Sequence, residues 1–106
     1  MKPIKISALA FEDANGGWIA QCIEYDITVR ADALLHLSKV LEREVLANLH
    51  VNRKLGREGL TGIPPAPEPF RMAFQAAKNR FVPQPRPDNK PIEIDEFRVV
   101  EKPLAA

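Results

Sequence analysis

A short stretch of the chain, residues 15–27, gathers the residue types that most often carry chemistry. It holds the only Trp, the only Cys and the only Tyr among 106 residues: Trp18, Cys22 and Tyr25. The carboxylates of Glu24 and Asp26 flank the tyrosine. A thiol can act as a nucleophile, and paired carboxylates can hold a divalent metal ion. Two enzymatic interpretations therefore have to be weighed first.

A structural role fits Cys22 better than a nucleophilic one. A reactive thiol needs a neighbouring cation or histidine to lower its pKa, whereas the charged neighbours of Cys22 in sequence are acidic. Free cysteines are also among the most buried residue types. We predict a core cysteine, no catalytic residue and no cofactor.

A metal site would need Glu24 and Asp26 to be joined by Glu12 or Asp13. The chain has 14 acidic residues, so such spacing arises easily by chance. His36 and His50 would lie about 21 Å apart on one helix and cannot share a metal. No phosphate loop, nucleophile elbow or zinc motif is present. We predict no metal site, and keep a small metal-dependent hydrolase or nuclease using these acidic residues as the alternative.

Composition indicates one small domain over residues 1–106. The hydrophobic content is 45% and the net charge is +1, which gives no general attraction to nucleic acid or to an anionic membrane. Direct nucleic-acid binding is therefore not expected. No apolar run approaches the roughly 18 residues of a membrane span. A single Cys cannot form an internal disulfide, which favours a reducing, cytoplasmic location.

Proline divides the chain into a core, residues 1–60, and an arm, residues 61–106. Eight of the ten prolines lie between Pro64 and Pro91, and proline interrupts regular structure. The arm is also locally basic, with five cations and one acid between Pro69 and Pro91. This bias could contact RNA or an acidic protein surface, but a solubilising linker is the favoured interpretation.

Alternation with period two predicts strands in the core. Residues 5–12 form the first strand, with Ile4, Ile6, Ala8 and Ala10 on one face. Asn15 and Gly16 suit a tight turn, because they tolerate positive φ. The second strand follows from Trp18, and its Ile face is expected to be buried from Ile23 onward. A third strand begins near Ile27.

A long helix is predicted from Ala33 to Leu55, with Asp32 as its N-cap and Gly56 at its end. Its apolar stripe contains Leu34, Leu37, Leu41, Val45, Asn48 and Leu55. Its polar side contains His36, Lys39, Arg43, His50 and Lys54.

The arm is expected to carry a short helix from Glu68 to Asn79, a second linker over residues 80–91 and a last strand from Ile92. In this strand Ile92 and Ile94 share one face, whereas strict alternation would place Phe97 and Val99 on the opposite face. A bulge at residues 95–96 would bring both pairs to one face, and a two-sided strand is the other possibility. The fold class expected is α+β: a small antiparallel sheet of three or four strands on one long helix, with a proline-rich arm.

The order of these features resembles the HicB-like antitoxin family over residues 4–49. The second strand of that family opens Gly-aromatic-aliphatic-Ala, matched here by Gly17, Trp18, Ile19 and Ala20. Glu24 stands where the family usually has Asp. At the start of the helix only Leu34 matches the family pattern, and the usual Thr cap, Glu-Ala pair and Pro-Gly turn are missing.

The resemblance implies a three-stranded antiparallel sheet against one helix, a later strand that joins the sheet, and self-association. It also implies a non-enzymatic role, in which the protein binds and masks a small toxin ribonuclease. The residues after Pro91 leave room for one strand and no DNA-binding helix pair. We predict a homodimer whose partner-binding residues are Trp18, Glu24, Tyr25, Arg71 and Arg80.

Overall fold

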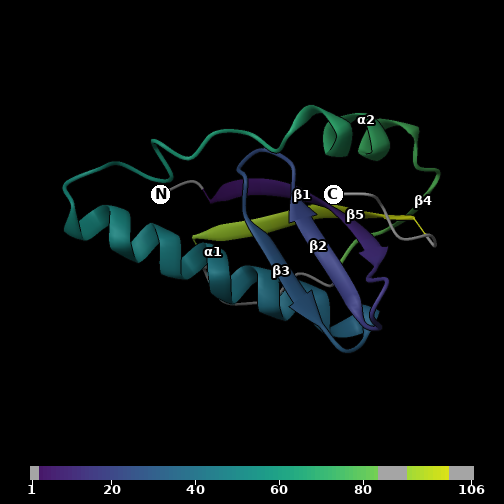
Figure 1. Ribbon diagram of the computed structural model, residues 1–106. Coiled ribbons are helices and arrows are strands. Elements are labelled where there is room, and N and C mark those ends of the chain that lie inside the picture. Colours follow the sequence, from purple (N-terminus) through teal and green to yellow (C-terminus); the bar gives the residue numbers. More distant parts are fainter. Residues whose placement is uncertain (1–2, 84–90, 101–106) are drawn as a thin grey trace.

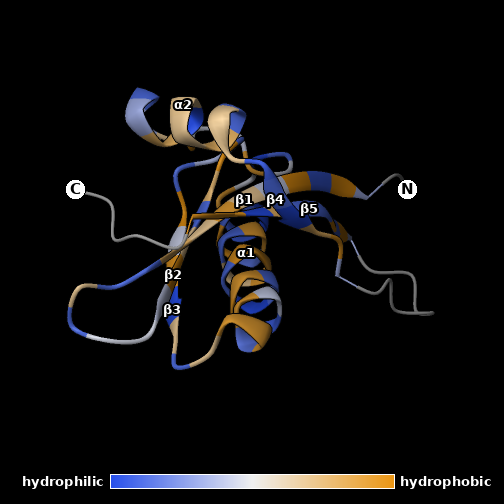
Figure 2. Cartoon of the chain, turned by 90° about the vertical axis from the view of Figure 1, so that its right-hand side faces the viewer, coloured by the Kyte–Doolittle hydropathy of each residue, from blue (hydrophilic) through white to orange (hydrophobic). Residues whose placement is uncertain are grey.

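Two helices cover opposite faces of one sheet in the computed structural model, which describes residues 3–83 and 91–100 (Figures 1 and 2). The elements follow the order β1 (Ile4–Glu12), β2 (Trp18–Cys22), β3 (Thr28–Ala31), the 3-10 turn η1 (Leu34–His36), α1 (Leu37–Lys54), α2 (Glu68–Ala76), β4 (Asn79–Phe81) and β5 (Ile92–Val100). The expected α+β class is thereby confirmed. Figure 2 shows α2 on one side of the sheet and α1 on the other.

The sheet is mixed, with five strands in the order β3-β2-β1-β5-β4 within the described residues. β1 and β5 run parallel, and the other neighbours run antiparallel. The prediction of an antiparallel sheet with three or four strands was therefore wrong. The short strand β4 had been assigned to a linker. β4 runs antiparallel to β5, so the chain travels along the sheet after β4 and turns back before β5. β5 therefore starts at the end of the sheet where β1 starts, and these two strands are parallel.

β1 lies at the centre of the sheet and is buried on both faces. Ile6, Ala8 and Ala10 belong to the main core beneath α1, as their predicted shared face requires. Leu9 and Phe11 point to the opposite face, yet they are only 0% and 5% exposed. The second face is therefore covered as well, and the ring of Phe11 stacks on Phe70 of α2 at 5.9 Å.

The face of β2 in the main core is the reverse of the predicted one. Ala20 and Cys22 are buried in the cluster beneath α1, and Trp18 packs against it. On the Ile face, which was expected to be buried from Ile23 onward, Ile27 is buried in this cluster, whereas Ile19 and Ile23 are only half-buried. The prediction followed side-chain apolarity, whereas the small side chains Ala20 and Cys22 let α1 approach the sheet closely.

Of the two possibilities stated for the last strand, β5 adopts the bulge at residues 95–96. Ile94 pairs with Ile6 and Glu96 pairs with Ser7, so Asp95 has no partner on β1. The extra residue reverses the alternation of the strand. The apolar residues on both sides of the bulge consequently lie on the α1 face: Ile92, Ile94, Phe97 and Val99.

α1 starts and packs slightly differently from expectation. The chain enters through η1, and no side chain caps η1 or α1, so the Asp32 cap was wrong. Leu37, Leu41 and Val45 are buried as predicted, and the stripe continues through Leu49 and Asn52. Leu55, predicted in the stripe, is 62% exposed because the helix ends there.

The end of α1 joins the arm through backbone and amide hydrogen bonds. Gly56 has φ of +75° and terminates the helix, as predicted. The Arg57 amide donates to the carbonyl of Asn52 at 2.8 Å, which closes the helix end. The Asn52 side chain in turn donates to the carbonyls of Gly59 and Thr61. This buried amide therefore fixes the path of the arm.

The arm carries the short helix that was predicted, although α2 ends at Ala76 rather than near Asn79. Ahead of α2, the Ala66 amide donates to the carbonyl of Ile23, and the Asp26 amide donates to the carbonyl of Pro64. These two bonds attach the arm to the loop between β2 and β3. Most of the second predicted linker, and the charged residues Arg86, Asp88 and Lys90, lie outside the described residues.

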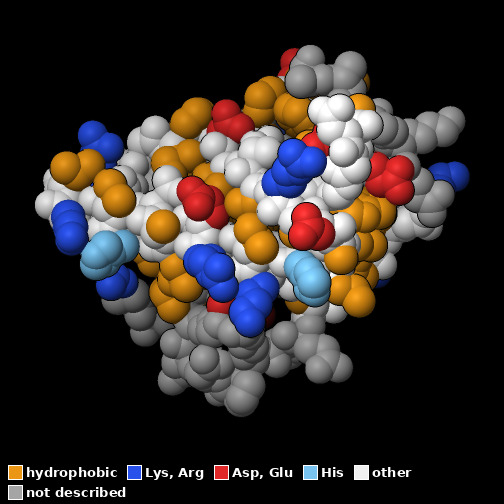
Figure 3. Space-filling model, turned by 60° about the horizontal axis from the view of Figure 1, so that its bottom comes forward, with side chains coloured by type: hydrophobic (Ala, Val, Ile, Leu, Met, Phe, Trp, Pro, Cys, Tyr) orange, Lys and Arg blue, Asp and Glu red, His pale blue; other side chains and the backbone are white. Residues whose placement is uncertain are grey.

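The outward side of α1 is polar, as its sequence pattern predicted. His36, Lys39, Arg43, His50 and Lys54 are all exposed. Figure 3 looks onto this side of the molecule and shows Lys, Arg and His side chains spread across it, with apolar patches between them. None of the helices in the described parts of the chain has the length and apolarity needed to cross a membrane.

Candidate functional site

Cys22 is a core residue in the described structure. Its side chain is 0% exposed, and its Sγ donates to Oε1 of Glu24 at 3.9 Å. Burial raises the pKa of the Cys22 thiol from 9.0 to about 11, and the Glu24 carboxylate adds to the rise against the hydrogen bonds of nearby amides. Such a thiol stays protonated at neutral pH and is a poor nucleophile.

The carboxylates of Glu24 and Asp26 are committed to structural hydrogen bonds. The backbone amide of Ser7 donates to Oε1 of Glu24 at 2.6 Å. The side-chain amide of Gln21 donates to Oδ1 of Asp26 at 3.0 Å, and the hydroxyl of Thr28 donates to Oε1 of Gln21 at 2.6 Å. These bonds hold the loop between β2 and β3 in place and satisfy the buried Gln21.

The four acidic residues of the hydrolase alternative do not meet. Glu24 contacts β1 at Ser7, whereas Glu12 closes the same strand five residues later, about 17 Å away in extended backbone. Asp13 pairs with Arg30 at 3.0 Å beside the first hairpin. Within residues 3–83 and 91–100, no three His, Cys, Asp or Glu side chains gather in a way that could hold a metal ion.

Trp18 and Tyr25, both predicted to bind a partner, lie at opposite ends of β2. Trp18 opens the strand, opposite Glu12 of β1 and Ala31 of β3. Tyr25 lies in the loop after the strand, next to Glu24. Both aromatic side chains are half-buried and pack against the main core. Each of the two side chains therefore contacts the core and also leaves part of its surface exposed.

Arg71 and Arg80, the other two predicted partner residues, lie on α2 and β4. Arg71 is exposed. Arg80 pairs with Oε2 of Glu96 at 3.5 Å, and Oε1 of the same carboxylate pairs with Arg98 at 3.4 Å. The five predicted residues thus occupy three regions: the start of β2, the loop after β2, and the α2–β4 side.

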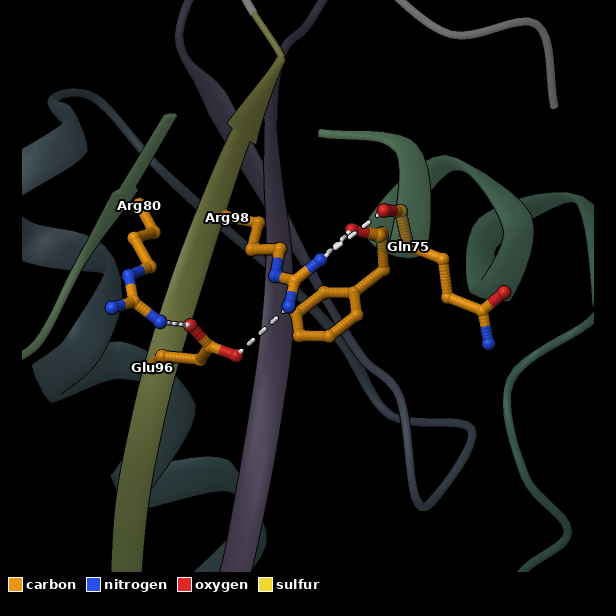
Figure 4. Close-up of polar contacts among 5 residues, drawn as sticks. Gln75, Arg80, Glu96 and Arg98 are labelled. Carbon is orange, nitrogen blue, oxygen red and sulfur yellow. Dashed lines mark hydrogen bonds and ion pairs between the residues drawn. The ribbon is translucent and has the colours of Figure 1, made fainter. Parts of the chain in front are cut away.

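Arg98 is the residue of this region that sequence reasoning missed. Its Nη1 donates to the carbonyls of Phe74 at 2.8 Å and Gln75 at 3.3 Å, in the last turn of α2 (Figure 4). The guanidinium also lies over the ring of Phe74, 4.4 Å from the centroid. A cation at a helix C-terminus complements the helix dipole. The alternation of Glu96 and Arg98 with apolar residues in β5 was the available signal.

Replacement of Arg98 by Met is expected to lower the free energy of unfolding by about 1–3 kcal/mol, because two charge-assisted hydrogen bonds to α2 are lost. The side chain is 26% exposed, so solvent replaces part of this loss. Urea unfolding and amide hydrogen exchange in α2 measure the effect. Arg71→Met is the matched control, since Arg71 is exposed on the same helix, and it should change stability by less than about 0.5 kcal/mol. Equal stability of the two variants would show that Arg98 does not hold α2.

Comparison with known proteins gives no assignment for this arrangement. No protein-family model matches the chain, and neither the search of curated proteins nor the search of solved structures finds a similar one.

Proposed function

We propose that this protein is a non-enzymatic interaction module of the HicB-like antitoxin kind, which binds and masks a small toxin ribonuclease. The order of elements around the sheet is the observation that carries the proposal. Three antiparallel strands, β3, β2 and β1, pack on the long helix α1, and the later strand β5 joins beside β1. This is the arrangement that the resemblance of residues 4–49 implies.

The chemistry of the described residues also favours binding over catalysis. The one thiol is buried with a raised pKa. The carboxylates nearest to it serve backbone and amide donors. No specific observation favours the metal-dependent hydrolase, because Glu24 contacts the middle of β1 at Ser7, whereas Glu12 and Asp13 lie at the end of that strand.

The candidate contact surface for the toxin is the loop between β2 and β3. Tyr25 offers a half-exposed aromatic side chain there, and aromatic residues contribute strongly to protein interfaces. The loop is rigid, because Glu24 and Asp26 are hydrogen-bonded and the arm is attached behind it. A preorganised loop loses little conformational entropy on binding.

The proposal requires that the reading frame adjacent to the gene for this chain encode a small basic protein of toxin size, and co-expression of the two proteins then tests the masking. That protein alone should arrest growth and cleave RNA, and co-expression should restore growth and allow the two proteins to be purified together. Tyr25→Ala should weaken the complex at least tenfold, as loss of an aromatic hot spot does. Lys54→Ala, at an exposed position on the far side of α1, should bind as the parent does.

Folding of both variants is checked by urea unfolding before binding is measured. An arrest that co-expression does not relieve, with no complex formed, would overturn the proposed masking role.

We also propose that the chain is a homodimer. The strands β3 and β4 are the two edges of the sheet in the described residues, and unpaired strand edges favour association with another chain.

A further inference from the structure

Basic and apolar side chains are mixed on the outward side of α1 (Figure 3). Part of the helix lines an open groove of about 440 Å³, which also touches Pro91 just before β5. Leu46 and Leu49 give the groove an apolar lining, and Leu49 belongs to the buried core, against which Leu46 packs. The fold therefore holds these two side chains in place, and the groove exists before any partner binds.

Three basic side chains line the same groove. Arg43, His50 and Arg53 are all exposed, and the two arginines lie about 15 Å apart along the helix. None of the described residues that line the groove is acidic. In the described parts of the chain neither arginine has an ion-pair partner. The groove is therefore basic in a chain whose net charge is only +1.

The lining defines the chemistry of an occupant. Carboxylates complement Arg43 and Arg53, but exposed ion pairs contribute little by themselves, so contact with the leucines has to supply much of the affinity. RNA fits less well, because none of the described lining residues is an aromatic on which a base could stack. An α-helix of about ten residues spans the distance between the arginines and can present carboxylates and apolar side chains together.

We propose that this groove binds a short, acidic, amphipathic helix of a partner protein. Its carboxylates pair with Arg43 and Arg53, and its apolar side chains contact Leu46 and Leu49. Binding of an amphipathic helix in an apolar groove is a common mode of peptide recognition. The groove shares no residue with the loop that carries Tyr25, so this second contact surface does not depend on toxin masking.

A short fluorescein-labelled peptide of glutamate and leucine, with its leucines at helical i, i+3, i+4 and i+7 spacing, is the probe. Fluorescence anisotropy with the full chain should show saturable binding. A second peptide, in which glutamine replaces every leucine, keeps the charge and loses the apolar face. It should bind at least tenfold more weakly, because the leucines supply much of the affinity.

Two variants locate the bound peptide. Arg43→Gln combined with Arg53→Gln removes both permanent charges of the groove and should weaken binding at least tenfold. Ala47→Trp fills the groove from an exposed position, keeps every charge, and should weaken binding to the same degree. Lys5→Gln combined with Lys78→Gln is the matched control, since it removes as much charge from exposed positions outside the groove and should bind as the parent does.

Urea unfolding of each variant first confirms that it is folded. No binding of the acidic peptide up to about 1 mM, or equal binding by the parent and both groove variants, would overturn the proposal. A single-stranded RNA oligonucleotide is the competing probe. RNA that binds as tightly as the peptide, and is weakened by the same two variants, would overturn the acidic helix in favour of a phosphate ligand. These outcomes leave toxin masking untouched, because masking is measured with Tyr25→Ala.

Discussion

Deletion of Asp95 is expected to unfold the domain or to lower its free energy of unfolding by at least about 3 kcal/mol. Asp95 is the extra residue that lets the apolar side chains before and after it face α1. Without it, one half of β5 must turn to the opposite face. Phe97, which is fully buried and stacked on Phe81 at 4.9 Å, would leave the core, and loss of a buried Phe typically costs about 3–5 kcal/mol.

Asp95→Ala is the matched control for this deletion. It keeps the number of residues in β5, and Asp95 is exposed, so the change in stability should be less than about 1 kcal/mol. Urea unfolding followed by circular dichroism compares the two variants. A deletion variant as stable as Asp95→Ala would show that the bulge does not set the facing of the strand.

Above pH 9 the domain is expected to lose stability through Cys22. The folded thiol has a pKa of about 11 against 9.0 for the ordinary thiol. Between these values the unfolded chain releases the thiol proton and the folded chain keeps it, so rising pH favours unfolding. The contribution is present below pH 9, is reduced by about 1 kcal/mol at pH 10, and is lost above pH 11, where the total loss reaches about 3 kcal/mol.

Urea unfolding at pH 8, 9, 10 and 11 measures this dependence, with Cys22→Ala as the control. Other groups titrate in the same range, so the difference between the parent and Cys22→Ala isolates the thiol. The difference should shrink as the pH rises from 9 to 11. A difference that stays constant over this range would show that Cys22 is not held protonated by the fold.

Much of the fold could be predicted because local patterns determine it. The alternation in residues 4–12 predicts the shared face that packs beneath α1, and the mismatch of parity around Asp95 left a bulge or a two-sided strand, of which the structure has the bulge. Gly56 marks the end of the long helix through its positive φ. These features depend on residues near each other in the chain, which is why one sequence is enough to find them.

Features that depend on distant packing were not predicted. The face of β2 was misjudged because both faces of the sheet are covered, so that Ile19 and Ile23 serve the second face while Ala20 and Cys22 serve the first. β4 was missed because a three-residue strand gives no periodic signal. Without β4 the direction of β5 could not be inferred.

The residues of the candidate site also divide into those whose role could be predicted from their neighbours in sequence and those that only the fold brings together. The structural role of Cys22 followed from its neighbours in sequence and agrees with its burial. The bonds from Arg98 to α2 join residues more than twenty positions apart, and only the folded chain brings them together. The side chain of Glu24 accepts a hydrogen bond from the backbone amide of Ser7 on another strand, a contact that no local pattern indicates, and its predicted contact with a partner stays a prediction.

The parallel pairing of β1 with β5 has a consequence for synthesis on the ribosome. Ile4 pairs with Ile92, so β1 waits for a strand that follows it by more than eighty residues. Until residues 92–100 have left the exit tunnel, β1 has one open side and Ile6 and Ala8 lack their neighbours on it. Pairing between residues so far apart is slow to form. During that interval the nascent chain exposes an unpaired strand edge, which is when a chaperone or a neighbouring nascent copy can bind it.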